Sequence, residues 1–102
     1  VVLKGARTVV AAPDGRVAVN PTGNPGMASG GMGDALAGIA GSLLGQGIGA
    51  FDAACAAVFW HGLAADRIAL RRGAAGLLAT DVVEELPAAL AERQVALFGT
   101  VR

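Results

Sequence analysis

The chain has 102 residues, which is enough for one domain or part of one and too few for a large multidomain enzyme. Eight basic and eight acidic side chains cancel to a formal net charge of zero, which excludes the basic surface typical of nucleic-acid or membrane-surface binding. The hydrophobic fraction of 54% includes 23 alanines, and there are 16 glycines, so the core must form by close approach of backbones. The single cysteine, Cys55, can form no internal disulfide and has no CxxC partner for zinc, so we expect a reducing, cytoplasmic location.

The sequence opens on Val1, Val2 and Leu3, as if inside a buried strand. We therefore expect that the start of the protein is missing from this sequence. No window reaches the ~18 strongly apolar residues in succession that a membrane span needs. The most apolar stretch, residues 53–65, is dominated by alanine and indicates a core helix.

Three β-rich segments are predicted at the start of the chain. Residues 1–3 form an apolar run closed by a lysine and a glycine, typical of a strand in a sheet covered on both faces. Segments 8–12 and 16–20 are separated by Pro-Asp-Gly at 13–15, in which proline presets φ and glycine supplies a positive φ. The two segments are therefore predicted to form a hairpin.

Three helical regions follow. Apolar residues recur at helical spacing between 36 and 44, which predicts a helix from 34 to about 45–47. A second helix is predicted over 52–72, with its first half buried. Thr80 is expected to cap a third helix, and Pro87 to open a separate final segment. A stripe of small residues that would let another element approach closely lies on the first helix: Gly38, Ser42 and Gly45.

The segment 20–33 holds five glycines and two prolines among fourteen residues and leads directly into Asp34. Glycines leave successive backbone N–H groups unobstructed, and a helix start carries about half a positive charge, so this loop can hold a phosphate. Asp34 would repel that phosphate, but it is well placed to accept a proton from a hydroxyl that attacks it. An aspartate that merely complements the helix dipole is the competing interpretation, and spacing alone leaves both open.

Two familiar nucleotide-binding loops do not match this segment. A P-loop would need Lys and Ser or Thr after its glycines, whereas the only lysine, Lys4, lies far upstream. A Rossmann fingerprint would need a third glycine after two further residues, whereas Gly33 is followed by residues 34–36, Asp-Ala-Leu.

Several other side chains have both structural and functional interpretations. Without further information Lys4 is a solvated lysine at a strand end. His61 lies in an apolar helix and is expected to be packed and hydrogen-bonded. Thr22 and Asn24 could cap local turns or line a site, and neither role is preferred. Three side chains are expected only to pack in the core: Cys55, Phe59 and Trp60.

The stretch 23–38, GNPGMASGGMGDALAG, resembles the signature of the ADP-dependent NAD(P)H-hydrate dehydratases, members of the ribokinase-like superfamily. Residues 4–8, KGART, are similar to the upstream nucleotide-binding segment of that family, and His61-Gly62 followed by Ala64, Ala65 and Asp66 also resembles it. GNPGM before GGxGD distinguishes the family from ordinary sugar and vitamin kinases. Small departures from the expected residues stand at Ser29, Ala35 and Ala37. The resemblance implies an α/β fold, a ribokinase-like three-layer α/β/α sandwich, of which this chain would be the C-terminal part with a β-hairpin followed by helices.

The resemblance also implies a reaction. The family repairs hydrated nicotinamide cofactors, NADHX and NADPHX, by using ADP to drive loss of the added hydroxyl, with release of AMP, phosphate and NAD(P)H. Asp34 would bind the hydrate and act as the catalytic base towards its 6-hydroxyl. The backbone of Gly31, Met32 and Gly33 would form the anion hole for the β-phosphoryl group. The residues implied to bind the nucleotide are Lys4, Gly5, Ala6, Arg7, Thr8 and Gly33.

Further expectations follow from the same resemblance. Mg²⁺ is expected with ADP, although no acidic pair makes a convincing metal site. A homo-oligomer and a fused or separate NAD(P)HX epimerase are implied, with no nucleic-acid or membrane partner. An ATP-dependent sugar or vitamin kinase and a non-catalytic anion-binding module remain as alternatives. Residues 1–102 alone are expected to be inactive, because a partial sheet leaves open edges and lacks groups that position the substrate.

Overall fold

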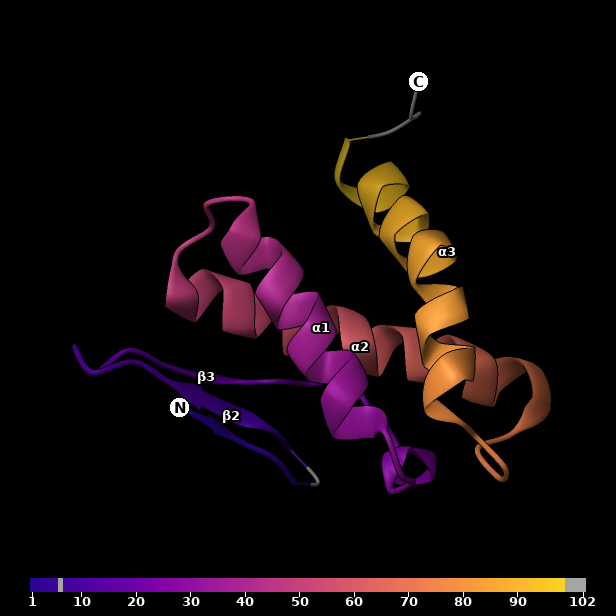
Figure 1. The fold of residues 1–102 in the computed structure, drawn as a ribbon. Coiled ribbons are helices and arrows are strands. Elements are labelled where there is room, and N and C mark those ends of the chain that lie inside the picture. Colours follow the sequence, from indigo (N-terminus) through magenta and orange to yellow (C-terminus); the bar gives the residue numbers. More distant parts are fainter. Residues whose placement is uncertain (6, 99–102) are drawn as a thin grey trace.

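The structure is a computed structural model that describes residues 1–5 and 7–98 (Figure 1). Within these residues a three-stranded antiparallel sheet comes first and the helices follow. The elements are β1 (Val2–Leu3), β2 (Val9–Ala11), β3 (Val17–Val19), a 3-10 turn (Pro25–Met27), α1 (Met32–Gly45), α2 (Ala50–Arg72) and α3 (Ala79–Phe98). The predicted α/β chain, with a β-hairpin followed by helices, is confirmed.

The sheet has the strand order β1-β2-β3, and its register sorts the side chains onto two faces. Val2, Val10 and Ala18 are paired across the strands and share one face, where Val10 is 2% exposed and β2 contacts α2. The opposite face stays largely open, since Leu3 is 68% and Val19 55% exposed. The expectation that the first strand is covered on both faces is therefore wrong within the described residues, because β1 is an edge strand and these helices cover a single face.

The first two helices lie close to their predicted positions. Gly31 has a φ of 86°, in the left-handed region that favours glycine, so α1 begins at Met32 rather than at Asp34. α2 covers the predicted range and ends before Gly73, which also has a positive φ of 84°. Figure 1 shows α2 passing behind α1 towards the start of α3, and contacts join α2 to both.

α3 is one continuous helix, which corrects two predictions. Thr80 lies inside the helix, and the Asp81 carboxylate caps it instead by accepting a backbone N–H from the residue before the helix at 2.9 Å. Pro87 also lies inside the helix rather than at the start of a separate segment. Its ring is exposed, whereas Val82 and Ala89, on either side of it in sequence, are fully buried. Core packing on both sides holds the helix together across the proline.

The main core lies between α2 and α3, with the start of α1 beside them. It consists of Met32, Ala64, Ala65, Ile68, Leu77, Val82 and Ala89. The alanines let the helices approach closely, as the composition predicted. By length and composition alone α2 is long and apolar enough to cross a membrane, and 44% of that stretch is buried inside the structure. The small-residue stripe of α1 takes no part in this core, since a Cβ at Gly38 or Gly45 would meet nothing within 4 Å.

Candidate functional site

The N-terminus of α1 carries Met32 and Gly33 of the predicted anion hole, and Gly31 is the residue directly before the helix. The first hydrogen bond inside the helix runs from the Ala35 N–H to the Gly31 carbonyl at 3.0 Å. The N–H groups of Met32, Gly33 and Asp34 therefore have no acceptor within the helix. Together with the positive end of the helix dipole, these aligned donors attract an anion.

Packing holds this helix end in place. The Met32 side chain is 5% exposed and belongs to the core. The Ser29 hydroxyl donates to the Leu77 carbonyl at 3.0 Å. A Cβ at Gly31 would lie 3.2 Å from the Cβ of Ala79, the first residue of α3. The loop and the residues at the start of α3 thus pack directly against the N-terminus of α1 and fix the position of its free N–H groups.

Two charged side chains flank the donors. The Lys4 Nζ lies 3.1 Å from the position that a Cβ would take at Gly33, so glycine there lets the ammonium group reach the helix end. The positive charge of Lys4 adds to the helix dipole, and both favour a phosphate. Asp34 lies in the first turn with an exposed side chain. Because like charges repel, the Asp34 carboxylate is a poor ligand for a bound phosphate. It can instead accept a proton from a hydroxyl group that attacks the phosphate.

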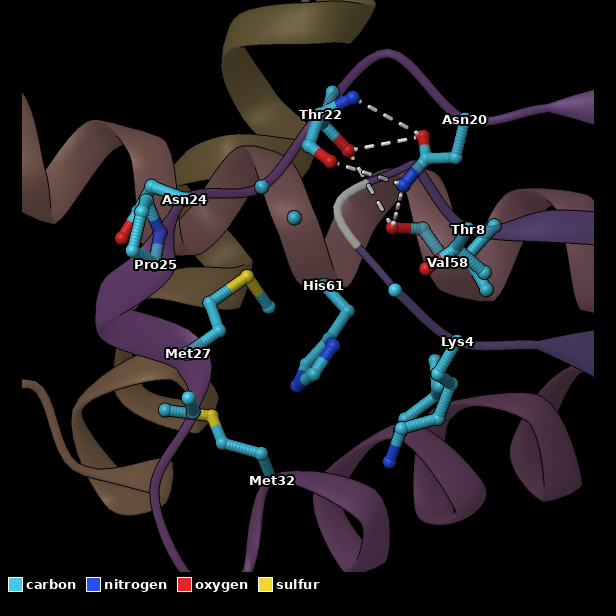
Figure 2. Close-up of a pocket in the computed structure, with 15 residues that line it drawn as sticks. Lys4, Thr8, Asn20, Thr22, Asn24, Pro25, Met27, Met32, Val58 and His61 are labelled. Carbon is cyan, nitrogen blue, oxygen red and sulfur yellow. Dashed lines mark hydrogen bonds between the residues drawn. The ribbon is translucent and has the colours of Figure 1, made fainter.

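A pocket of about 580 Å³ opens between the sheet, the loop before α1, and α2 (Figure 2). From the predicted nucleotide segment, Lys4, Gly5 and Thr8 line it, whereas Arg7 is exposed and does not. Ala6 lies outside the described residues, and Asp34 is not part of the pocket wall. The volume lies in the range typical of small-molecule sites, about 300–1,000 Å³. Apolar walls come from Met27, Met32, Leu36 and Val58.

Asp66 of α2 ties the GNPG loop to the helix. Its Oδ2 accepts the N–H of Gly23 and its Oδ1 accepts from the Asn24 side-chain amide, each at 2.9 Å. The Asn24 Oδ1 in turn accepts the N–H of Gly26 at 3.0 Å and caps the 3-10 turn. Asn24 and Thr22 also line the pocket. Asn24 caps a turn as well, whereas the Thr22 N–H donates to the Asn20 Oδ1 at 3.3 Å, so Asn20 caps that turn.

A second set of hydrogen bonds joins the end of β3 to α2. Asn20 is 8% exposed, and its Nδ2 donates to the carbonyls of Val58 at 3.0 Å and Thr22 at 3.2 Å. The Thr22 Oγ1 lies 3.0 Å from the Phe59 carbonyl. A Cβ at Gly62 would overlap this Oγ1 and lie 2.7 Å from the Thr22 carbonyl carbon. The loop and α2 can therefore come this close because residue 62 is glycine.

His61 differs from its prediction. It is packed, with 6% of its surface exposed, but its Nε2 has no hydrogen-bond partner among the described residues. Figure 2 shows the ring projecting into the pocket, towards the space bounded by Met27, Met32 and Lys4. Burial, and to a lesser extent the charge of Lys4, lowers the pKa of the imidazole from its usual value. The Nε2 lacks the predicted hydrogen bond because the ring faces the pocket rather than a neighbouring helix.

The three α2 side chains expected in the core are only half-buried, and of these Trp60 packs against the core. Cys55 is half-buried, and that burial raises the pKa of its thiol. Phe59 and Trp60 are half-buried as well, with their rings edge to face at 5.4 Å. The sequence is apolar around most of this helix, whereas its described neighbours cover only part of the circumference.

Three residues important to the site were not predicted: Asn20, Met27 and Asp66. Gly62 and Asp66 are four residues apart and so lie on one face of the helix, which could have placed Asp66 towards the loop. Met27 belongs to the GNPGM motif that carries the family resemblance, although no role was predicted for its side chain, and for Asn20 the sequence carries no comparable signal.

Acidic side chains do not gather into a metal site. Across residues 1–5 and 7–98, no three His, Cys, Asp or Glu side chains come together. Asp66 accepts hydrogen bonds from Gly23 and Asn24 of the loop, and Asp34 stands at the start of α1. These residues therefore do not fit a Mg²⁺ site built from protein side chains.

Residues 1–88 match the family model described as NAD(P)H-hydrate dehydratase. Over 85 residues the chain is 56% identical to the bifunctional NAD(P)H-hydrate repair enzyme of Escherichia coli. The matched region covers 83% of this chain and 16% of that protein. Over 83 residues it is 55% identical to the ADP-dependent (S)-NAD(P)H-hydrate dehydratase of Neisseria meningitidis. This matched region covers 80% of the chain and 28% of that protein.

The fold is similar to that of a Bacillus subtilis ADP/ATP-dependent NAD(P)H-hydrate dehydratase crystallised with ATP and Mg²⁺. The TM-score is 0.84 at 38% identity, over 88% of this chain and 32% of that chain. The chain thus spans a third or less of each of these proteins. Since the family match runs from residue 1 to residue 88, the chain belongs to the NAD(P)H-hydrate dehydratase family.

Proposed function

We propose that residues 1–102 are the C-terminal part of the catalytic domain of an ADP-dependent NAD(P)H-hydrate dehydratase. The reaction converts hydrated NADH or NADPH and ADP into NAD(P)H, AMP and phosphate. The observation that carries the proposal is the position of the Lys4 ammonium beside Gly33, at the helix end that also bears Asp34. A cationic helix end with a carboxylate in its first turn suits phosphoryl transfer to a hydroxyl group.

The reaction has two steps. Asp34 takes the proton of the 6-hydroxyl, and the oxygen attacks the β-phosphorus of ADP as the bond to AMP breaks. The backbone N–H groups of residues 31–33 stabilise negative charge on the phosphoryl group during transfer. The phosphate ester then leaves the ring with its bonding electrons while the adjacent carbon releases a proton to solvent. This elimination restores the ring double bond and yields NAD(P)H and phosphate.

The nucleotide would lie between the segment 4–8 and the start of α1. Lys4 and the Gly33 N–H would hold the phosphates, and Gly5 and Thr8 border the pocket available for the adenosine. Mg²⁺ would accompany the phosphates, which the ATP and Mg²⁺ in the Bacillus subtilis crystals support. Among the described residues no three His, Cys, Asp or Glu side chains gather to hold the ion.

The rest of the active site would come from residues outside this chain. The small share of each relative that the chain spans supports this, as does the exposure of Leu3 and Val17, at 68% and 62%. We expect residues 1–102 alone to show background turnover. We also propose a cytoplasmic homo-oligomer, and an epimerase as partner or fused domain, which the bifunctional Escherichia coli relative supports.

An assay on the intact protein, the gene product that carries these residues, tests the proposal. Hydrated NADH is incubated with ADP or with ATP while the dihydropyridine absorbance is followed. Recovery of absorbance with ADP, with AMP formed in equal amount, is the expected result. No recovery with either nucleotide would contradict the dehydratase. An ATP-dependent kinase of the same superfamily would instead phosphorylate a sugar or vitamin with the same Asp34, and a binding module would show no turnover at all.

A further inference from the structure

Two buried polar side chains in the described part of the chain border the pocket, and they differ in their hydrogen bonds. The Asn20 amide is satisfied, since its Nδ2 donates to the Val58 carbonyl at 3.0 Å and its Oδ1 lies 3.0 Å from the Thr22 hydroxyl. The His61 Nε2 has no partner among the described residues, although 94% of the residue's surface is buried, given its 6% exposure. A buried polar atom without a partner is unfavourable, so this nitrogen points to a ligand in the pocket.

The surroundings of the ring indicate the chemistry of that ligand. Figure 2 shows the His61 ring reaching from α2 into the space bounded by Met27, Met32 and Lys4. Methionine sulfur makes favourable contacts with aromatic rings, so the two thioethers suit a flat heterocycle. The Lys4 ammonium, which also lies near Gly33, suits a phosphate at the edge of the same space. A nucleotide combines both features.

The protonation state of His61 favours the base over the phosphate. Burial and the nearby Lys4 charge lower the pKa of the imidazole, so the ring is neutral at pH 7. A neutral imidazole offers one donor and one acceptor, whereas only a charged ring would pair strongly with phosphate. The edge of a purine carries both ring-nitrogen acceptors and, in adenine, amino donors.

We propose that His61 binds the adenine base of ADP, with its Nε2 hydrogen-bonded to an atom on the edge of the purine. This inference rests on the proposed function for the identity of the nucleotide, and it adds recognition of the base to the contacts with the phosphates. Hydrated NADH also contains adenine. The assignment is to ADP because Lys4, Gly5 and Thr8 line the same pocket as His61.

Two substitutions in the intact protein test the contact. His61→Met fills a similar volume without a ring nitrogen, and His61→Gln places an amide where Nε2 lies. His61→Met should raise KM for ADP about tenfold, the value of one neutral hydrogen bond, with kcat and KM for the hydrate changed less than about twofold. His61→Gln should recover most of the affinity. Ile68→Val, in the core of α2 and outside the pocket, is the control, and thermal melts establish that each variant folds.

Base analogues distinguish recognition from packing. Purine riboside diphosphate lacks the amino group of ADP, and 1-deaza-ADP, 3-deaza-ADP and 7-deaza-ADP each lack one ring nitrogen. With one of these analogues the wild-type protein should lose about tenfold in affinity, and His61→Met should lose less than about twofold, because the bond is already gone. Equal losses in both proteins with every analogue, or a rise confined to KM for the hydrate, would overturn the assignment.

Calorimetry with ADP alone keeps this inference separate from the proposed function. Binding of ADP that weakens about tenfold in His61→Met supports the contact even if the intact protein does not dehydrate hydrated NADH. Dehydration with an ADP affinity that His61→Met leaves unchanged would overturn the contact and leave the proposed function in place. A wild-type protein that does not bind ADP would overturn both.

Discussion

Replacing Gly62 with alanine should push the GNPG loop away from α2. A Cβ at this position would overlap the Thr22 hydroxyl and lie 2.7 Å from the Thr22 carbonyl carbon. The hydroxyl can rotate, but the carbonyl carbon can move only if the loop moves. That movement would also break the hydrogen bond from the Thr22 Oγ1 to the Phe59 carbonyl, now 3.0 Å long.

The expected size of the effect is the sum of three contributions. Forcing a methyl group into a packed contact costs about 1–3 kcal/mol. The lost hydrogen bond adds about 1 kcal/mol, and alanine returns about 1 kcal/mol through its helix propensity. The free energy of unfolding should therefore fall by about 1–3 kcal/mol. Because the same loop leads to Gly31, kcat/KM for dehydration should fall about tenfold to a hundredfold.

Urea unfolding of the intact protein measures the first effect, and the ADP-dependent recovery of dihydropyridine absorbance measures the second. Gly41→Ala is the matched control, because a Cβ at Gly41 of α1 would meet nothing within 4 Å. That variant should be as stable as the wild type or up to about 1 kcal/mol more stable. A Gly62→Ala protein as stable and as active as Gly41→Ala would refute the close approach of loop and helix.

Three further substitutions test other contacts. Asp34→Asn should lower kcat by about 10²–10⁴-fold, with ADP binding by calorimetry nearly unchanged, because it removes a proton acceptor and no phosphate ligand; wild-type turnover in this variant would rule out Asp34 as the base. Asp66→Asn keeps at most one of two carboxylate bonds to the loop, so urea unfolding should show a loss of about 1.5–3 kcal/mol, and an unchanged midpoint would contradict the tether. The guanidinium groups of Arg71 and Arg67 hold the pKa of Glu85 below its usual 4.5, so the stability that this carboxylate contributes is present above that pH and is lost as the pH falls through the lowered pKa. Glu85→Gln should therefore lose about 1 kcal/mol at pH 7 and match the wild type well below pH 4, as followed by thermal melts across pH, and a difference independent of pH would refute this role.

Local chemistry accounts for what could be predicted from the sequence. The hairpin follows from Pro13 and Gly15 between β-rich segments, and the position of α1 follows from a glycine-rich loop that precedes a run of helical periodicity. The anion-binding helix end follows from the same pattern, because consecutive glycines before a helix expose backbone donors wherever that helix packs. These features depend on neighbours in the sequence.

Features set by tertiary contacts could not be predicted in this way. Pro87 signals a helix boundary, but burial of Val82 and Ala89 against α2 carries α3 across it. The direction of the His61 ring depends on where the loop and the sheet meet α2, which residues within one helix do not reveal. The open face of the sheet, likewise, depends on which elements pack over it and not on the apolar character of the strands.

The fate of the hydroxyl oxygen tests the central claim most directly. Hydrated NADH carrying heavy oxygen at its 6-hydroxyl is incubated with ADP and the intact protein, and the released phosphate is analysed by mass spectrometry. If Asp34 directs that oxygen onto the β-phosphorus at the start of α1, the label should appear in phosphate, one atom for each NADH formed. Label recovered in water, with unlabelled phosphate, would show that dehydration proceeds without phosphorylation and would contradict the proposed mechanism.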